Sequence, residues 1–153
     1  GENVRLAAQA ALGASLRLVT LPRRGDAAHR RAAVALERVG LADRAGERAA
    51  DLSHGDKRKL ELALVLVAEP SVLLLDEPTA GVSIEETRPL VDLIDAVHAA
   101  GTTIVMVEHR MEFVVDVSDR IAVMHQGKLL MTGTPAEVTA DTTVREAYLG
   151  GHR

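Results

Sequence analysis

Apolar and polar residues alternate along this chain with two different periods, and the pattern changes near residue 50. In the first part, alanine and leucine at helical spacing predict helices over Asn3–Val19 and His29–Val39, with Gly40 as the stop of the second helix. Leu21–Asp26 between them has the composition of a basic loop, and Ala42–Ala50 that of a short connector. The first part of the chain is therefore predicted to be helical.

From Ser53 onwards, helices and strands are predicted to alternate. Ser53 can cap a helix that runs to Val67 before Pro70, and Ser83-x-x-Glu86 has the capping-box pattern that opens another. The other expected elements are buried strands at Val72–Leu75 and Thr102–Val107, a short helix at Met111–Val117, a hairpin of Arg120–His125 and Lys128–Thr132 around Gln126-Gly127, and a last helix capped at Thr143. This alternation predicts an α/β fold with a parallel sheet and flanking helices.

Composition narrows the possible functions. Apolar residues make up 47% of the chain and aromatic residues only 1%, so any core must consist of Leu, Val, Ile and Ala. The absence of cysteine excludes disulfides and thiolate metal sites. A net charge of −4 argues against a nucleic-acid partner. The longest apolar stretch, Leu62–Ala68, is far shorter than the roughly 20 residues of a membrane helix, so any membrane association would go through a partner.

Two adjacent carboxylates, Asp76 and Glu77, follow the apolar run Val72–Leu75, and Pro78 then stops the strand. A parallel sheet delivers such residues to its carboxyl edge, where α/β proteins bind ligands. There, one carboxylate can orient a water bound to Mg²⁺, and a second can accept a proton from an attacking water. A strand that simply ends in solvated acids before a turn is the alternative interpretation.

Two further sites can recognise an anion. The predicted helix that begins Ser53-His54-Gly55-Asp56 offers free N–H groups, a hydroxyl and a glycine that permits close approach. His109 follows the second apolar strand, and its imidazole can donate a hydrogen bond to a phosphate oxygen. An ordinary capped helix and a solvated surface histidine are the alternatives for these two sites.

In this order and spacing, the three motifs resemble the signature motif, the Walker B strand and the switch histidine of ABC transporter ATP-binding subunits. The resemblance implies ATP and Mg²⁺ as cofactors, with Asp76 binding Mg²⁺ through water and Glu77 and His109 as catalytic residues. It also implies that Ser53, His54, Gly55 and Asp56 contact the γ-phosphate of ATP held by a second subunit. His54 and Asp56 depart from the usual Leu-Ser-Gly-Gly-Gln, and Arg110 stands where aspartate is common.

Two more segments carry the resemblance. Ala80–Ser83 occupies the place of the D-loop, which crosses the interface between two such subunits, although the segment is also explained as a helix cap. Gly133–Val138 is common across ABC importers. Val144–Gly150 resembles the ending of branched-chain amino acid transport ATPases, while urea and lipopolysaccharide transport ATPases share related tails. An amphipathic terminal helix with Tyr148 packed on the core is the alternative for this tail.

The P-loop pattern G-x-x-x-x-G-K-[ST] is absent from the sequence. The one Gly-Lys pair, Gly127-Lys128, is followed by Leu129, and Ala122 occupies the position of the first glycine. We therefore interpret the chain as the C-terminal portion of an ABC subunit with a partial P-loop NTPase fold. The expected division is part of the helical subdomain at 1–50, the signature helix, Walker B, D-loop and switch region at 51–134, and a tail helix at 135–153.

The resemblance implies that two such subunits sandwich ATP at the cytoplasmic face of the cell membrane. There they would drive uptake of branched-chain amino acids or a similar small polar solute through permease partners. Without the phosphate cradle this chain alone is expected to be almost inactive, and its unpaired strand edges are expected to cause self-association. A chromosome-maintenance ATPase lobe is one alternative, disfavoured by the lack of sustained heptads. A non-catalytic interaction module is the other, and Glu77 argues weakly against it.

Overall fold

The computed structural model describes residues 1–13 and 26–149, which form two compact units that meet in sequence between Val107 and Glu108. The elements of unit 1 are α1 (Glu2–Ala11), α2 (Ala27–Arg38), the 3₁₀ turns η1 (Ala42–Arg44) and η2 (Ala49–Asp51), α3 (His54–Leu66), β1 (Val72–Asp76), α4 (Ile84–Ala99) and β2 (Thr103–Val107). The elements of unit 2 are α5 (Met111–Val117), β3 (Ile121–His125), β4 (Lys128–Gly133), α6 (Pro135–Ala140) and α7 (Thr142–Leu149).

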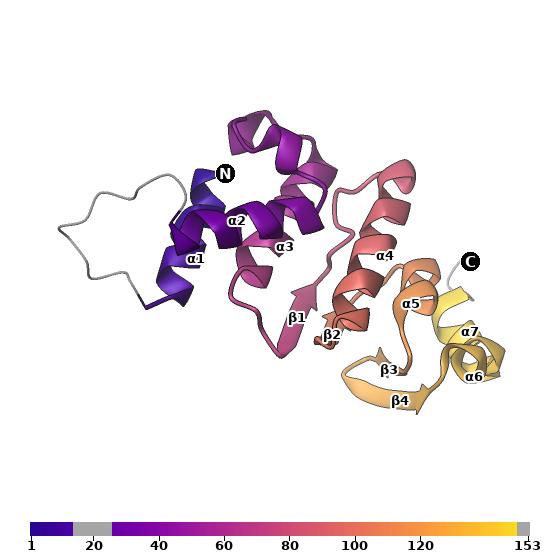
Figure 1. Ribbon diagram of the computed structural model, residues 1–153. Coiled ribbons are helices and arrows are strands. Elements are labelled where there is room, and N and C mark those ends of the chain that lie inside the picture. Colours follow the sequence, from indigo (N-terminus) through magenta and orange to yellow (C-terminus); the bar gives the residue numbers. More distant parts are fainter. Residues whose placement is uncertain (14–25, 150–153) are drawn as a thin grey trace. The chain divides into compact units, whose positions relative to one another are not determined.

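Helices α1, α2 and α3 pack against one another in unit 1 (Figure 1). Their shared core is formed by small and branched apolar side chains, namely Val4, Ala8, Ala28, Ala32, Ala35, Leu36, Leu62, Ala63 and Leu66. The alanines let the helix backbones approach closely, and the Val and Leu side chains fill the remaining space. The helical first part predicted from the sequence is therefore confirmed in the described residues.

Local signals set the ends of these helices. The Asp26 side chain caps α2 by accepting a hydrogen bond from the His29 N–H at 2.8 Å. Gly40 ends α2 with a φ of +69°, a left-handed conformation that glycine adopts at low cost. The first helix was predicted to reach Val19, but α1 ends at Ala11 because Gly13 adopts the same left-handed conformation, with a φ of +68°. The rest of that predicted range lies outside the described residues.

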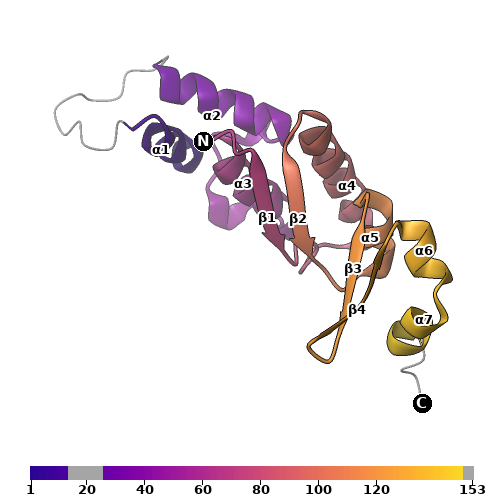
Figure 2. The same ribbon diagram turned by 90° about the horizontal axis from the view of Figure 1, so that it is seen from below.

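Strands β1 and β2 pair in parallel, and α4 connects them (Figure 2). The register runs from Val72 opposite Thr103 to Asp76 opposite Val107. Both hydrogen bonds of the predicted capping box at Ser83 and Glu86 are present at the start of α4. The expected strand–helix–strand unit is thus confirmed, and Asp76 lies at the carboxyl end of the pair.

One face of this strand pair is uncovered. Leu74 is 73% exposed, and Val105, its partner in the register, is 53% exposed, so two apolar side chains share a solvated face. Leu73, which points to the opposite face, is 2% exposed. The prediction that both strands are buried was therefore wrong, because no other element among the described residues of unit 1 covers this face.

Unit 2 contains an antiparallel hairpin and three helices. Gln126 and Gly127 form its turn with φ values of +48° and +75°, and a β-bulge follows Val123, so the predicted hairpin is confirmed. The tail expected as one helix at 135–153 contains two helices, α6 and α7, and the start of α6 was not predicted although Thr134 and Glu137 form a complete capping box there. The cap of the last helix was placed two residues too late: Asp141, not Thr143, accepts the hydrogen bond from the Val144 N–H, at 2.9 Å.

The core of unit 2 consists of Ile121, Val123, Val138 and Val144, with Met111 and Leu130 among the partly buried side chains around them. Tyr148, at the end of α7, is not packed in this core. Its ring is 43% exposed, and its hydroxyl donates a hydrogen bond to the Met124 carbonyl at 2.6 Å. Within the described parts of the chain, no helix is both long and apolar enough to cross a membrane.

Candidate functional site

The first predicted site lies at the N-terminus of α3. Ser53 adopts an extended conformation, and its hydroxyl accepts a hydrogen bond from the Asp56 N–H at 3.1 Å, so the predicted cap is confirmed. Ser53 and His54 are exposed, whereas Gly55 is buried in the first helical turn. This arrangement gives a solvated hydroxyl beside the positive end of the helix dipole, which suits the binding of an anion.

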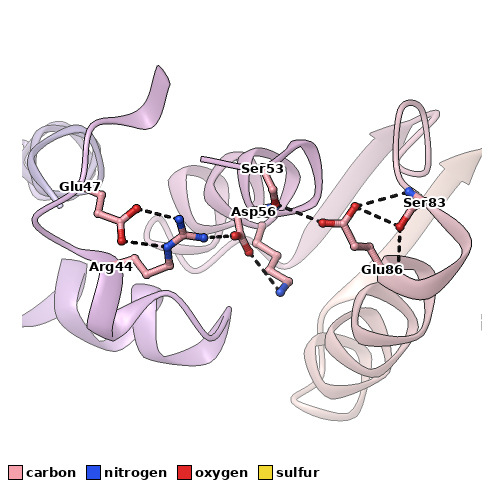
Figure 3. Close-up of polar contacts among 7 residues, drawn as sticks. Arg44, Glu47, Ser53, Asp56, Ser83 and Glu86 are labelled. Atoms are coloured by element: carbon pink, nitrogen blue, oxygen red, sulfur yellow. Dashed lines mark hydrogen bonds and ion pairs between the residues drawn. The ribbon is translucent and has the colours of Figure 1, made fainter. Parts of the chain in front are cut away.

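Asp56 does not add an uncompensated negative charge to this helix end. Arg44, from η1, forms an ion pair with one Asp56 oxygen, and Lys59 Nζ lies 3.4 Å from the other (Figure 3). The Arg44 guanidinium also binds the Glu47 carboxylate at 2.7 Å, and this contact holds the pKa of Glu47 below its usual value. Arg44 and Lys59 therefore balance the charge that Asp56 brings to the N-terminus of α3.

Glu86 is a further residue at this site that the sequence assigned only to a helix cap. Ser53 Oγ donates a hydrogen bond to Glu86 Oε1 at 3.1 Å, although the two residues lie 33 positions apart (Figure 3). The other oxygen, Oε2, accepts from the Ser83 hydroxyl at 3.3 Å. Arg58 on α3 also donates to the Ala80 carbonyl at 3.4 Å, so α3 is joined to the segment before α4 and to α4 itself.

Asp76 is the last residue of β1, Glu77 follows it directly, and both are exposed. Glu77 has a φ of +44°, a left-handed conformation that is costly for a residue with a side chain. Two main-chain hydrogen bonds hold it there: its N–H donates to the Val107 carbonyl at 2.8 Å, and its carbonyl accepts from the Ala80 N–H at 2.9 Å. The backbone of the strand pair therefore fixes the direction in which this carboxylate leaves the sheet.

The donors near β1 suit a hard cation that keeps most of its water. Carboxylate oxygens are the ligands Mg²⁺ prefers, and Mg²⁺ is commonly held by one or two carboxylates together with waters and phosphate oxygens. Across the described ranges, no group of three or more His, Asp or Glu side chains could hold a metal ion by itself. The Asp76 carboxylate, which was predicted to bind Mg²⁺ through water, is a donor of this kind at the end of β1.

His109 belongs to unit 2, and its imidazole is exposed. Its backbone N–H donates to Glu108 Oε2 at 2.7 Å, and the Arg110 N–H donates to the same oxygen at 3.0 Å. His109 Nδ1 lies 3.6 Å from this oxygen. The Glu108 carboxylate thus fixes the backbone around the histidine, a role that sequence reasoning did not assign to it.

A cavity of about 250 Å³ lies in the helical part of unit 1, away from the predicted catalytic carboxylates. Its lining residues come from the start of α1, from α2, from the 3₁₀ turns and from α3, and include Glu2, Leu36, Arg44, Glu47 and Leu60. The arginine that pairs with Asp56 therefore also borders this cavity.

Solved structures with the same fold identify the class of protein. MJ1267, an ATP-binding cassette of an ABC transporter, aligns with 95% of this chain and 61% of its own at a TM-score of 0.79 and 23% identity. The cbiO1 protein from Clostridium perfringens, part of the ABC transporter complex cbiONQ, aligns with 91% of this chain and 55% of its own at a TM-score of 0.72 and 33% identity. The fold is that of an ABC-type ATP-binding cassette, and the predicted fold class is confirmed.

Sequence profiles identify the family. The profile described as ABC transporter matches residues 2–80, and that of the branched-chain amino acid ATP-binding cassette transporter matches residues 128–153. This chain therefore belongs to the ABC transporter family, as its motifs predicted.

Two curated relatives are branched-chain amino acid transport ATP-binding proteins. LivG of Salmonella typhimurium is 46% identical over 78% of this chain and 48% of its own length. BraF of Pseudomonas aeruginosa is 39% identical over 75% and 46%, respectively. Another relative, the energy-coupling factor transporter ATP-binding protein EcfA2 of Symbiobacterium thermophilum, is 44% identical over 77% of this chain and 41% of its own length. The chain spans about half the length of the curated relatives it matches.

Proposed function

We propose that this chain acts as the C-terminal part of an ATP-binding subunit that powers the import of branched-chain amino acids or a similar small polar solute. The observation that carries the proposal is the 46% identity with LivG, together with the match of residues 128–153 to the branched-chain amino acid profile. The branched-chain amino acid profile covers the tail and not the nucleotide motifs.

We further propose a role for each predicted site residue. Asp76 orients a water on the magnesium ion, and Glu77 accepts a proton from the water that attacks ATP. Ser53, His54, Gly55 and Asp56 contact the γ-phosphate of ATP held by a second subunit, and His109 donates a hydrogen bond to a phosphate oxygen of ATP. Bound ATP and Mg²⁺ supply the transferred phosphoryl group and the charge that neutralises it. The cap at Ser53 and the strand-end position of Asp76 support these assignments.

The partners follow from the same relatives. We propose a second ATP-binding subunit, facing the signature helix α3, and permease subunits that hold the assembly at the cytoplasmic face of the membrane. The helical subdomain, residues 1–50, docks on the permease. Residues 51–134 carry the nucleotide motifs, and residues 135–153 form the tail. The mildly acidic balance of the chain supports the absence of a nucleic-acid partner.

The experiment that tests the catalytic assignment is Glu77→Gln in a subunit that joins this chain to a P-loop segment. Glutamine keeps the size and polarity of the side chain but removes the base. We expect ATP to bind and hold the two subunits together while turnover falls by about 10²-fold or more. Glu85→Gln, an exposed acid on α4, is the control with the same change of charge. Unchanged turnover in Glu77→Gln would assign the general base to another residue.

The chain by itself should hydrolyse ATP negligibly, since phosphoryl transfer depends on a cradle for the nucleotide and no P-loop motif stands in this sequence. Phosphate release by the purified chain in the presence of Mg²⁺ should equal that of its Glu77→Gln variant. Magnesium-dependent release that disappears in the variant would contradict this expectation.

A further inference from the structure

The Glu86 carboxylate belongs to α4 but lies at the N-terminus of α3. It accepts a hydrogen bond from Ser53 Oγ at 3.1 Å, which is the hydroxyl that caps α3. A carboxylate at this place benefits from the positive end of the helix dipole, as any bound anion would. The structure therefore shows an internal anion at the helix end where the proposed function places a phosphate.

Gly55 allows this close approach. A Cβ atom built on Gly55 would lie 2.6 Å from Glu86 Oε1 and 2.7 Å from the carboxylate carbon, closer than real Cβ contacts. The carboxylate consequently rests against the bare backbone of the first turn of α3. The absence of a side chain at Gly55 serves Glu86 as it would serve a phosphate oxygen, because both need to reach the same backbone.

Glu86 also has a second set of partners on its own helix. Its Oε2 atom lies 3.3 Å from the Ser83 hydroxyl and 3.5 Å from the Ser83 N–H, which together close the capping box of α4. The carboxylate can therefore give up Ser53 and still keep hydrogen-bond donors. An incoming phosphate would therefore break the contact with Ser53 and leave the contacts with Ser83 in place.

We propose that Glu86 is a positioning residue that occupies the phosphate-binding place at Ser53 and Gly55 in the absence of nucleotide, and that an arriving phosphate releases its Oε1 from Ser53 while its Oε2 keeps the contacts with Ser83. This inference rests on the proposed anion-binding role of Ser53 and Gly55. The exchange couples the signature helix to the start of α4, since one carboxylate serves both helix ends. Phosphate binding at the N-terminus of α3 therefore changes the surroundings of Ser83.

The test uses inorganic phosphate as the probe and the complete 153-residue chain, labelled with ¹⁵N. Phosphate is titrated while the amide signals of Gly55, Asp56 and Ser83 are followed by NMR. Glu86→Gln keeps the shape of the side chain and its ability to complete a capping box, but removes the charge that competes with phosphate. Glu85→Gln removes one charge from the adjacent position and controls for the general field of α4.

We expect Glu86→Gln to lower the phosphate Kd at Gly55 and Asp56 by about five-fold or more, since a unit charge within a few ångströms is removed. Glu85→Gln should change it by less than about two-fold, because exposed charges are screened. In the unmodified chain, phosphate should also shift the Ser83 amide. In Glu86→Ala this remote shift should vanish while the shift at Gly55 remains, a result that a purely structural Glu86 would not produce.

The outcomes separate the two proposals. Equal phosphate affinity in the unmodified chain, Glu86→Gln and Glu85→Gln would overturn the role of Glu86 and leave the anion site of α3 intact. No phosphate-dependent shift at Gly55 or Asp56 in any variant would remove the anion site itself, and the role of Glu86 with it.

Discussion

Two regions of unit 1 bury their apolar residues to very different extents. In the helical region, formed by α1, α2 and α3, Leu62 is 6% exposed within the core that the three helices share. In the strand pair, formed by β1 and β2, Leu74 is 73% exposed and shares its face with Val105. The strands have the more apolar sequences of the two, so composition does not account for the difference.

The difference lies in how each element finds its partners. An amphipathic helix has one apolar stripe, and two neighbouring helices suffice to cover it. An apolar strand in a parallel sheet has two apolar faces, so it needs a layer on each side. The strand pair has a layer on the Leu73 face but none among the described residues of unit 1 on the Leu74 face. A helical region can therefore close its core with few elements, whereas a strand pair of this kind requires more.

The sharpest test of this comparison makes one chemical change in both regions. Leu62→Ala should lower the free energy of unfolding by about 2–5 kcal/mol, because it leaves a cavity in the core shared by the three helices. Leu74→Ala should change it by no more than about 0.5 kcal/mol, because its side chain is already solvated. Urea unfolding followed by circular dichroism measures both. Similar losses in the two variants would mean that another layer covers Leu74.

The second prediction concerns association. The exposed face of the strand pair should drive self-association of the chain, as unpaired apolar strands do. Replacing Leu74 and Val105 together by Lys should restore a monomer in light scattering over a wide concentration range. The control replaces Leu6 and Val34 by Lys. These two residues belong to the helical region and are 51% and 49% exposed, respectively. A control as effective as the strand-pair variant, or an unmodified chain that is monomeric throughout, would refute the prediction.

The smallest effect concerns pH in the helical region. The backbone N–H of His29, together with the His29 ring, holds the pKa of the Asp26 carboxyl below its usual value. Because the folded pKa is the lower one, Asp26 stabilises the fold above the unfolded value of about 3.9, and this stabilisation is lost as the pH falls through the folded value. Asp26→Asn, which keeps a capping side chain, should therefore lose less stability on acidification than the unmodified chain.

The free energy of unfolding measured at intervals between about pH 5 and pH 2 checks this expectation. This pH range includes the window below the ordinary carboxyl pKa. Asp95→Asn on α4 is the matched control, since it removes one exposed carboxylate from another helix. An identical acid profile for Asp26→Asn and the unmodified chain would show that the cap contributes nothing through its charge.

Local features of this fold were predictable from sequence, and features that depend on distant partners were not. The caps at Ser53 and Ser83 and the turn at Gln126-Gly127 follow from signals within a few residues, and the structure confirms all three. The same kind of signal at Thr134 and Glu137 was available and was overlooked. The burial of Thr102–Val107 was misjudged because a run of apolar residues shows what a strand can bury, not which layers are present to cover it.

The candidate site follows the same division. Its motif residues could be named because each motif is a short segment whose chemistry is readable in place. Arg44 and Glu86 could not, since Arg44 reaches Asp56 across 12 positions and Glu86 reaches Ser53 across 33. Helical spacing makes neighbours of residues three or four apart, but contacts between separate elements depend on packing. The charge balance of the signature helix therefore became visible only in three dimensions.

The left-handed backbone at Glu77 costs the protein stability but provides a carboxylate at this turn. Glycine would adopt that φ of +44° without the cost of about 1–2 kcal/mol that a residue with a Cβ atom bears there. The chain instead has at this turn a side chain that can accept a proton. A laboratory selection for heat resistance alone would therefore favour glycine at position 77, and the variants it enriched would have lost the carboxylate on which hydrolysis is proposed to depend.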